Sequence, residues 1–273
     1  MLGKEIRLKR LMPTPDGKYL GLTVDHAIAR GVMPGLDTVA QTLRRMAAGS
    51  PNAITMHKGI AENCFGPVAG TVPLVLKLTT FGIYHPNEDT PVADVEEAVA
   101  LGADAVSVGC ILGGAAQPSQ LAMLGRFSKE AHRLGMPLIS HIYPRGEMIP
   151  KADQTSVDNV IYAARAAAEL GVDLIKTNYT GSPDTFAKVV QAVPARVAIA
   201  GGTSCKTAEE YIRMTRDVMD AGAAGVTYGR FVITYPHITA LVKTLSQVIH
   251  NGMSVKEAMT LLSHLEHEEE NCK

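Results

Sequence analysis

A lysine lies within one of the short apolar runs of this sequence. The run "DLIKTNYTG", which begins at Asp173, contains Lys176 and ends in small and hydroxyl-bearing residues. Side chains alternate between the two faces of a strand, so Lys176 shares its face with Leu174 and Asn178. If that face is buried, poor hydration lowers the pKa of the lysine and leaves a neutral amine that can attack a carbonyl carbon. One interpretation of Lys176 is therefore Schiff-base chemistry.

Two further residues could move protons next to such an amine. Asp25 follows the run "GLTV" and could take the proton lost when a carbinolamine dehydrates, although a carboxylate at that position can also simply cap a loop. Tyr143 in "HIYPRG" could pass a proton to a substrate oxygen, or it could only pack beneath a loop. Lys176 could also be a structural residue, ion-paired with Asp25, and Lys58 and Lys77 are rival candidates for the reactive amine.

Two glycine-containing turns are candidate phosphate sites. "AIAGGTS" places Gly201 and Gly202 after one apolar run, and "VTYGRF" places Gly229 and Arg230 after the next. Backbone N–H groups can approach a phosphate closely when no Cβ intervenes, and a guanidinium group matches phosphate geometry. The alternative is that both are tight turns with an arginine on the surface.

Histidines near the ends of the runs make a metal-dependent hydrolase the other chemical class to consider. His26, His57, His85 and His141 lie near such ends, but no run contains H-x-H and no helical segment contains H-E-x-x-H. Only one carboxylate, Asp25, accompanies them at a strand end. We therefore expect no metal and no other cofactor.

The segments that must position these residues repeat along the chain. Four times a helical segment ends in glycine and an apolar run follows, in "LGADAVSVG", "LGMPLISHIY", "LGVDLIKTNY" and "AGAAGVTYG". Glycine just past a helix end is the usual left-handed cap, and a β-branched run after it is typical of a buried parallel strand. Runs of this kind predict eight strands, beginning at Tyr19, Asn52, Pro73, Ala103, Pro137, Asp173, Arg196 and Gly225.

Eight β/α units in a chain of this length predict an α/β fold, a (β/α)8 TIM barrel, with an additional helix formed by the C-terminal "SVKEAMTLLSHLEHEEENCK". The rival fold is a doubly wound open sheet, but the first strand is not followed by its G-x-G-x-x-G nucleotide motif. Active sites of TIM barrels lie at the C-terminal ends of the strands, where all the candidate residues above fall.

Composition limits the possible partners and the compartment. The chain has 273 residues, 46% of them hydrophobic, and no Gly-, Pro- or Ser-rich linker, which favours a single domain over residues 1–273. A net charge of -1 argues against binding nucleic acid or an anionic membrane. The four cysteines are far apart, and neither a signal peptide nor an apolar segment of membrane-spanning length is present. We therefore expect a cytoplasmic protein.

The motifs together resemble those of a known family. "VDHA", "HKGI", "YPRG", "IKTNYTG", "AGGTS" and "AGAAGVTYGR" resemble, in order and spacing, the deoxyribose-phosphate aldolase superfamily, and within it the archaeal-type class I fructose-bisphosphate aldolases and aminodeoxyheptulosonate synthases. The resemblance implies that Lys176 is the Schiff-base lysine, that Asp25 is a proton-transfer carboxylate and that Tyr143 handles the hydroxyl proton during carbon–carbon cleavage. It also implies a homo-oligomer, often a decamer.

The resemblance also implies a substrate class. Gly201, Gly202, Gly229 and Arg230 are expected to hold a phosphate, and His26 and Arg145 complete the expected substrate-binding set. The expected reaction is cleavage of a phosphorylated ketose, most simply fructose 1,6-bisphosphate, into dihydroxyacetone phosphate and glyceraldehyde 3-phosphate. A transaldolase of the aminodeoxyheptulosonate synthase type, an autoinducer-type thiolase and a non-enzymatic assembly protein are the alternatives. The segments "GRFVITYPH" and "TTFGIYHPNEDT" differ from the family pattern and lie where substrate choice is made.

Overall fold

The apolar runs form eight parallel strands that close into a barrel. The structure is a computed structural model and describes residues 1–201 and 205–271. Around the barrel the strands follow the order β1-β10-β9-β8-β7-β6-β3-β2, and all eight predicted strands are confirmed. Their bounds are β1 (Tyr19–Thr23), β2 (Ala53–Met56), β3 (Leu74–Lys77), β6 (Ala105–Leu112), β7 (Leu138–Pro144), β8 (Leu174–Thr177), β9 (Arg196–Ala200) and β10 (Gly225–Tyr228).

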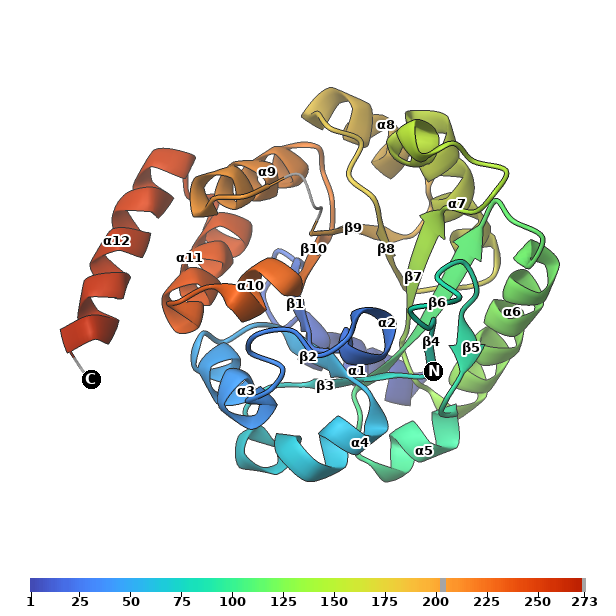
Figure 1. Cartoon of the computed structure of the whole chain (residues 1–273), viewed down its shortest axis with the longest axis horizontal. Helices are drawn as coiled ribbons and strands as arrows, with labels where there is room; N and C mark the ends of the chain where they lie inside the picture. The colour runs from blue at the N-terminus through green and yellow to red at the C-terminus, as the bar shows by residue number, and fades with distance from the viewer. Residues whose placement is uncertain (202–204, 272–273) are drawn as a thin grey trace.

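Helices surround this barrel, as Figure 1 shows, and the TIM-barrel prediction is confirmed. The glycines at the four predicted helix-to-strand junctions, Gly102, Gly135, Gly171 and Gly222, all have φ between 64° and 86°, as a left-handed cap requires. The outer helices are α3 (Val39–Ala48), α5 (Val95–Ala100), α6 (Gln117–Leu134), α7 (Val157–Glu169), α8 (Pro183–Ala192), α9 (Ala208–Asp220) and α11 (Ile238–Asn251).

Shorter helical segments lie in the connections. Between β2 and β3, where the sequence pattern is irregular, the chain forms three short turns of helix in place of one long helix. The predicted C-terminal helix is α12 (Val255–Asn271), which packs against α11 and α9 at one side of the barrel (Figure 1). The short segments are α2 (Ala27–Arg30), α4 (Lys58–Ile60), η1 (Ala61–Phe65), η2 (Gly66–Val68), η3 (Lys151–Thr155) and α10 (Arg230–Thr234).

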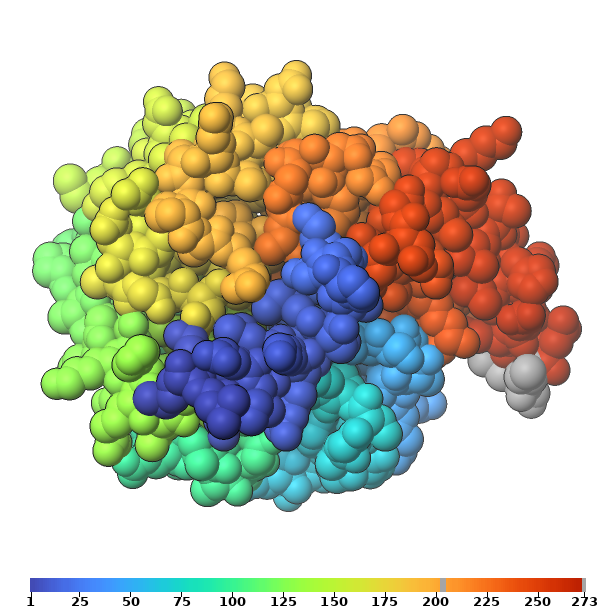
Figure 2. Space-filling view, turned by 180° about the vertical axis from the view of Figure 1, so that it is seen from behind, coloured from blue at the N-terminus to red at the C-terminus, as the bar shows by residue number. Residues whose placement is uncertain are grey.

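A helix before the barrel and a small pair of strands were not predicted. Helix α1 (Leu2–Leu11) precedes the barrel, and the loop after β3 folds into a small antiparallel pair, β4 (Thr79–Thr80) and β5 (Thr90–Pro91). Seen from behind in Figure 2, the N-terminal segment lies across the face of the barrel opposite to that viewed in Figure 1. No helix within the described part of the chain is long and apolar enough to cross a membrane.

The barrel interior is apolar towards the N-terminal ends of its strands. Tyr19, Val75, Ile139 and Leu174, from four different strands, are buried there in one cluster together with Leu11 at the end of α1. Since side chains alternate along a strand, this packing also determines which residues face the interior one layer higher. Helix α1 thus closes one end of the barrel, and the other end is left for the site.

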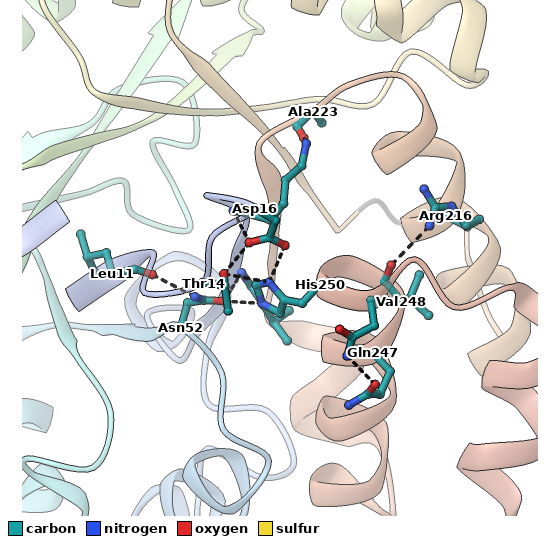
Figure 3. Close-up of polar contacts among 12 residues, drawn as sticks. Leu11, Thr14, Asp16, Asn52, Arg216, Ala223, Gln247, Val248 and His250 are labelled. Carbon is teal, nitrogen blue, oxygen red and sulfur yellow. Dashed lines mark hydrogen bonds and ion pairs between the residues drawn. The ribbon is translucent and has the colours of Figure 1, made fainter. Parts of the chain in front are cut away.

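Polar contacts join this closed end to α11. Asn52, just before β2, accepts a hydrogen bond from the Leu20 amide at 2.8 Å and donates one to the Leu11 carbonyl oxygen at 3.0 Å. His250 lies 3.1 Å from the Asn52 side-chain oxygen and 3.0 Å from Asp16, as Figure 3 shows. One buried amide therefore links α1, β1 and α11.

We expect Asn52→Ala to lower the free energy of unfolding by about 2–4 kcal/mol. Asn52 is only 7% exposed, and its removal leaves the amide of Leu20 and the carbonyl oxygen of Leu11 without their partner in a region closed to water. Urea unfolding measures the change. Asn63→Ala is the matched control, because Asn63 is exposed and its side chain, among the described residues, bonds only to the Gly59 carbonyl oxygen one turn earlier. Its effect is therefore expected to stay within about 0.5 kcal/mol. Equal midpoints for the two variants would contradict the structural role of Asn52.

Candidate active site

A cavity of about 700 Å³ opens at the C-terminal ends of the strands. Its walls carry both polar and apolar groups, and they come from the ends of β1, β3, β6, β7, β8, β9 and β10 and from the loops that follow them. Gly202 lies outside the described residues. The other predicted site residues all line this one cavity: Asp25, His26, Tyr143, Arg145, Lys176, Gly201, Gly229 and Arg230.

Lys176 lies near the end of β8 and points into the barrel. It follows Leu174 by two positions, and Leu174 belongs to the interior cluster, so both side chains face inward. Lys176 is 7% exposed. Burial lowers its pKa to about 8; the charges of Lys77 and Arg230 act in the same direction, and Asp25 opposes them. With this pKa about one lysine in ten is a neutral amine at pH 7, whereas an ordinary lysine is neutral in fewer than about one case in a thousand.

Asp25 comes two residues after the end of β1 and faces the same space. Its carboxylate lies 3.7 Å from His26 and 3.9 Å from His141, and no ion pair within 4 Å joins it to Lys176 among the described residues. Burial disfavours the charged carboxylate, but the basic groups around it, His26, Lys176 and Lys77, outweigh this effect and lower the pKa of Asp25. Asp25 is thus an ionised acceptor beside the amine.

The two histidines next to Asp25 are neutral. Burial lowers the pKa of His26 to about 4, although the charge of Asp25 opposes this shift, and burial lowers the pKa of His141 well below its usual value. The charge of Lys176 adds to both shifts. Among the residues described here, no three His, Cys, Asp or Glu side chains form a group suited to a metal ion.

Tyr143 lies near the end of β7, on the strand adjacent to that of Lys176. In the register of the two strands His141 is opposite Lys176, and Tyr143 is two residues further along, on the same interior face. Burial raises the pKa of Tyr143, and the charge of Asp25 raises it further. The phenol is therefore protonated, and it makes no hydrogen bond to any other residue that the structure describes.

The residues predicted to bind phosphate lie at the ends of the last two strands. Gly201 follows β9, and Gly229 caps α10, whose first residue is Arg230. Arg230 forms no side-chain hydrogen bond or ion pair within the described chain, so its guanidinium is available to a ligand. Gly229 also has a packing role that the sequence did not indicate, since a Cβ there would lie 2.2 Å from the His26 ring and 2.5 Å from the Thr23 hydroxyl.

Because of these contacts, we expect Gly229→Ala to destabilise the protein by about 1–3 kcal/mol, the usual cost of overpacking. Gly125→Ala is the control, since Gly125 lies within α6 and nothing lies within 4 Å of a Cβ built on it. Helix propensity predicts that this control is neutral or slightly stabilising. The urea midpoints of unfolding of the two variants are compared with that of the wild-type protein. An unchanged midpoint for Gly229→Ala would show that the His26 ring moves aside without cost, and it would contradict the packing role of Gly229.

The two rival lysines behave differently. Lys58 lies outside the cavity and pairs with Glu97 at 2.5 Å on the surface, which removes it as a candidate for the reactive amine. Lys77 lines the cavity and is 5% exposed. Burial lowers its pKa, opposed by Asp89 and Asp25. The cavity therefore contains two buried lysines, on β8 and at the end of β3.

Asp89 is a cavity residue that the sequence did not reveal. It lies in the loop after β3, ten positions beyond Thr79, and only the folding of β4 and β5 brings it inside. Arg145 belongs to the same region, because its guanidinium stacks 4.8 Å from the ring centre of Phe81 and donates a hydrogen bond to the Pro86 carbonyl oxygen. The one sign of Asp89 in the sequence was that its loop, "TTFGIYHPNEDT", departs from the family pattern.

The fold and the cavity define an aldolase-type barrel with a buried lysine. Residues 20–234 match the DeoC/LacD family aldolase, and the chain belongs to this family. A 2-amino-3,7-dideoxy-D-threo-hept-6-ulosonate synthase from Halobacterium salinarum is 34% identical over 94% of this chain and 95% of its own length. A class 1 fructose-bisphosphate aldolase from Thermoproteus tenax is 32% identical over 90% of this chain and 94% of its own.

A solved structure is similar over the same extent. It is an archaeal fructose-1,6-bisphosphate aldolase with its catalytic lysine covalently bound to the carbinolamine intermediate of the substrate. It is 30% identical to this chain, covers 91% of it and 99% of its own length, and has a TM-score of 0.83. This chain therefore has the scaffold of a class I, Schiff-base aldolase.

Proposed function

We propose that this chain is a class I aldolase that cleaves fructose 1,6-bisphosphate, with Lys176 as the Schiff-base nucleophile. The observation that carries the proposal is the buried Lys176 amine, whose pKa burial lowers to about 8, at the inner end of the cavity beside an ionised carboxylate. Neutral amines attack ketones, and a poorly hydrated site favours the neutral form. We further propose a single domain over residues 1–273, acting as a homo-oligomer in the cytoplasm.

The first half of the reaction builds the imine. The neutral Lys176 amine adds to the ketone carbon, and Asp25 accepts a proton from the nitrogen and passes it to the former ketone oxygen, which gives a carbinolamine. The protonated phenol of Tyr143 then gives its proton to the departing hydroxide, which leaves as water. The products are a protonated imine on Lys176 and a phenolate at Tyr143, two opposite charges that stabilise each other in a site with little water.

The second half breaks the carbon–carbon bond. The Tyr143 phenolate takes the proton of the C4 hydroxyl, the C3–C4 electron pair moves to form an enamine with the imine nitrogen, and the aldehyde leaves. Protonation of the enamine carbon and addition of water then release dihydroxyacetone phosphate and restore the Lys176 amine. Each proton taken up in one step is returned in another, so the side chains of Lys176, Asp25 and Tyr143 regain their initial protonation states.

Phosphate binding falls to the last two strands. Gly201, Gly202, Gly229 and Arg230 would hold the phosphate of the ketone half, with the Arg230 guanidinium as its charged partner. His26 packs against Gly229 and is neutral, so it can donate one hydrogen bond without adding charge. Arg145, held at the cavity mouth, is suited to the second phosphate of a bisphosphate.

We expect kcat/KM for cleavage to fall about tenfold for each pH unit below about 8, the value to which burial lowers the pKa of Lys176. The sign follows from the chemistry, because acid converts the reactive amine into an unreactive ammonium ion. The rate of borohydride trapping with dihydroxyacetone phosphate between pH 6 and 10 should show the same inflection. A rate that is still rising about tenfold per pH unit at pH 10 would show that the pKa of Lys176 is not lowered. A rate that is constant over this range would show that the protonation of Lys176 does not control trapping.

The second candidate is a transaldol reaction of the kind that the Halobacterium salinarum relative suggests, which is favoured by its 34% identity over nearly the whole chain. Both reactions share the imine and the enamine. They differ in the fate of the enamine, which is either protonated or transferred to a second aldehyde.

The test is to measure the cleavage of fructose 1,6-bisphosphate in an enzyme-coupled assay, with and without EDTA. Equal release of dihydroxyacetone phosphate and glyceraldehyde 3-phosphate, unaffected by EDTA, supports the proposal. Turnover that requires an added aldehyde acceptor supports the transaldol reaction instead. Activity that is lost in EDTA and restored only by zinc contradicts both and favours a metal-dependent mechanism.

A further inference from the structure

The loop between β3 and α5 carries a second carboxylate into the cavity. Asp89 is 5% exposed and lines the cavity, and its side chain accepts a hydrogen bond from the Thr79 hydroxyl at 2.8 Å. Gln120 of α6 fixes its backbone on both sides, accepting from the Asp89 amide at 3.3 Å and donating to the Asp89 carbonyl oxygen at 2.8 Å. The carboxylate is therefore held rigidly although it comes from a loop.

A glycine on β6 makes room for this carboxylate. A Cβ on Gly109 would lie 2.1 Å from the Asp89 carboxylate, so any other residue there would exclude it. The Gly109 amide donates to the Thr79 hydroxyl at 2.7 Å. Along the sheet Gly109 is opposite His141, which is opposite Lys176, so Asp89 occupies an interior position at the level of the reactive lysine.

One oxygen of Asp89 is left open to the cavity. Within the described chain, the second carboxylate oxygen has no hydrogen-bond partner, and the nearby Lys77 amine reaches only the Thr79 hydroxyl, at a long 3.5 Å. An ionised carboxylate can only accept hydrogen bonds. The group that completes Asp89 is therefore a donor such as a hydroxyl, and a phosphate is excluded there by like charge.

Strand order locates this open oxygen relative to the substrate. In the closed order β1-β10-β9-β8-β7-β6-β3-β2, strands β6 and β3 are directly across the barrel from β10 and β9. A ketose whose phosphate lies at β9 and β10 and whose carbonyl carbon is joined to Lys176 on β8 extends past Tyr143 on β7. Its other half, the part released as aldehyde, then lies against β6 and β3.

We propose that Asp89 is a specificity-determining residue that accepts a hydrogen bond from the hydroxyl next to the carbonyl of the aldehyde half. This rests on the proposed function, because it assumes that Lys176 holds the ketone half. The aldehyde substrates selected in this way are 2-hydroxyaldehydes.

The test compares two aldehydes that differ only in this hydroxyl, lactaldehyde and propanal, in aldol addition to dihydroxyacetone phosphate. We expect the wild-type protein to prefer lactaldehyde in kcat/KM, and Asp89→Asn to reduce that preference about 10- to 100-fold, since a hydrogen bond to a charged group is at stake. In the Asn variant Thr79 still donates to the side-chain oxygen, which turns the amide nitrogen, a donor, towards the cavity. Asp89→Ala, measured in parallel, removes the group altogether.

Glu88→Gln is the matched control. Glu88 is the exposed neighbour of Asp89 on the same loop and does not line the cavity, so this variant removes the same charge and should keep the wild-type preference. Borohydride trapping of dihydroxyacetone phosphate on Lys176, with no aldehyde present, should be equal in all four proteins and shows that the donor site is intact.

The outcomes separate the two proposals. An unchanged preference in both Asp89 variants, with trapping intact, overturns the role of Asp89 and leaves the aldolase proposal standing. Equal rates with lactaldehyde and propanal in the wild-type protein also overturn the role of Asp89 and leave the aldolase proposal standing. Loss of trapping in both Asp89 variants also overturns it, because it places Asp89 on the donor side. Absence of trapping in the wild-type protein overturns the proposed function itself.

Discussion

Lys176→Met is expected to reduce cleavage of fructose 1,6-bisphosphate by roughly 10,000-fold or more while the protein stays folded. The substitution removes the proposed nucleophile, on which every later step depends, so the covalent route is lost and not merely slowed. Methionine is unbranched and similar in length, and it carries no charge that must be buried, so the interior of β8 can accommodate it. Steady-state kinetics at saturating substrate measure the loss, and circular dichroism confirms the fold.

Two lysine variants are the controls for this result. Lys58→Met changes a surface residue paired with Glu97 and should keep wild-type activity. Lys77→Met removes the other buried lysine of the cavity and should keep Lys176 reactive towards dihydroxyacetone phosphate. Residual activity above about 1% in Lys176→Met would contradict the covalent mechanism, and loss of imine trapping only in Lys77→Met would reassign the nucleophile.

Tyr143→Phe is expected to lower kcat about 100- to 10,000-fold and to leave KM nearly unchanged. In the proposed mechanism the phenol supplies the proton for dehydration and takes up the C4 hydroxyl proton, and positioned acid–base groups contribute factors of this size. It has no part in holding the phosphates, so ground-state binding should persist. Phenylalanine fills the same space, which limits any structural effect.

The measurement for Tyr143 is the separation of kcat from KM. Tyr162→Phe is the matched control, since Tyr162 is 49% exposed on α7 and lies outside the cavity. A change confined to KM would make Tyr143 a binding residue, and an unchanged kcat would remove it from the mechanism.

The barrel itself was predictable because its signals are local. Each strand is an apolar run, and four of the helix-to-strand junctions contain a glycine. The sequence marks these glycines as helix caps, and in the structure they have the positive φ that such caps require. Helix α1 gave no comparable signal, because Leu11 is its only buried residue and its role, closing the barrel, is a tertiary contact. The pair β4 and β5 has strands of two residues each, too short for any periodicity.

The part of the candidate site that lies at the ends of the strands could be predicted from the sequence. Lys176, Tyr143 and Asp25 follow directly from strand alternation and from the rule that barrel sites lie at the C-terminal ends. Asp89 could not be found in this way, because it reaches the interior through a loop and only the missing side chain of Gly109 admits it. The packing of Gly229 against His26 was hidden for the same reason, since the two lie far apart in sequence.

The most direct test of the central claim is borohydride reduction in the presence of dihydroxyacetone phosphate or fructose 1,6-bisphosphate, read by intact and peptide mass spectrometry. We predict a single adduct per chain, on the peptide that contains Lys176, and none in Lys176→Met. No adduct under conditions that label a control class I aldolase, or an adduct on another lysine, would contradict it.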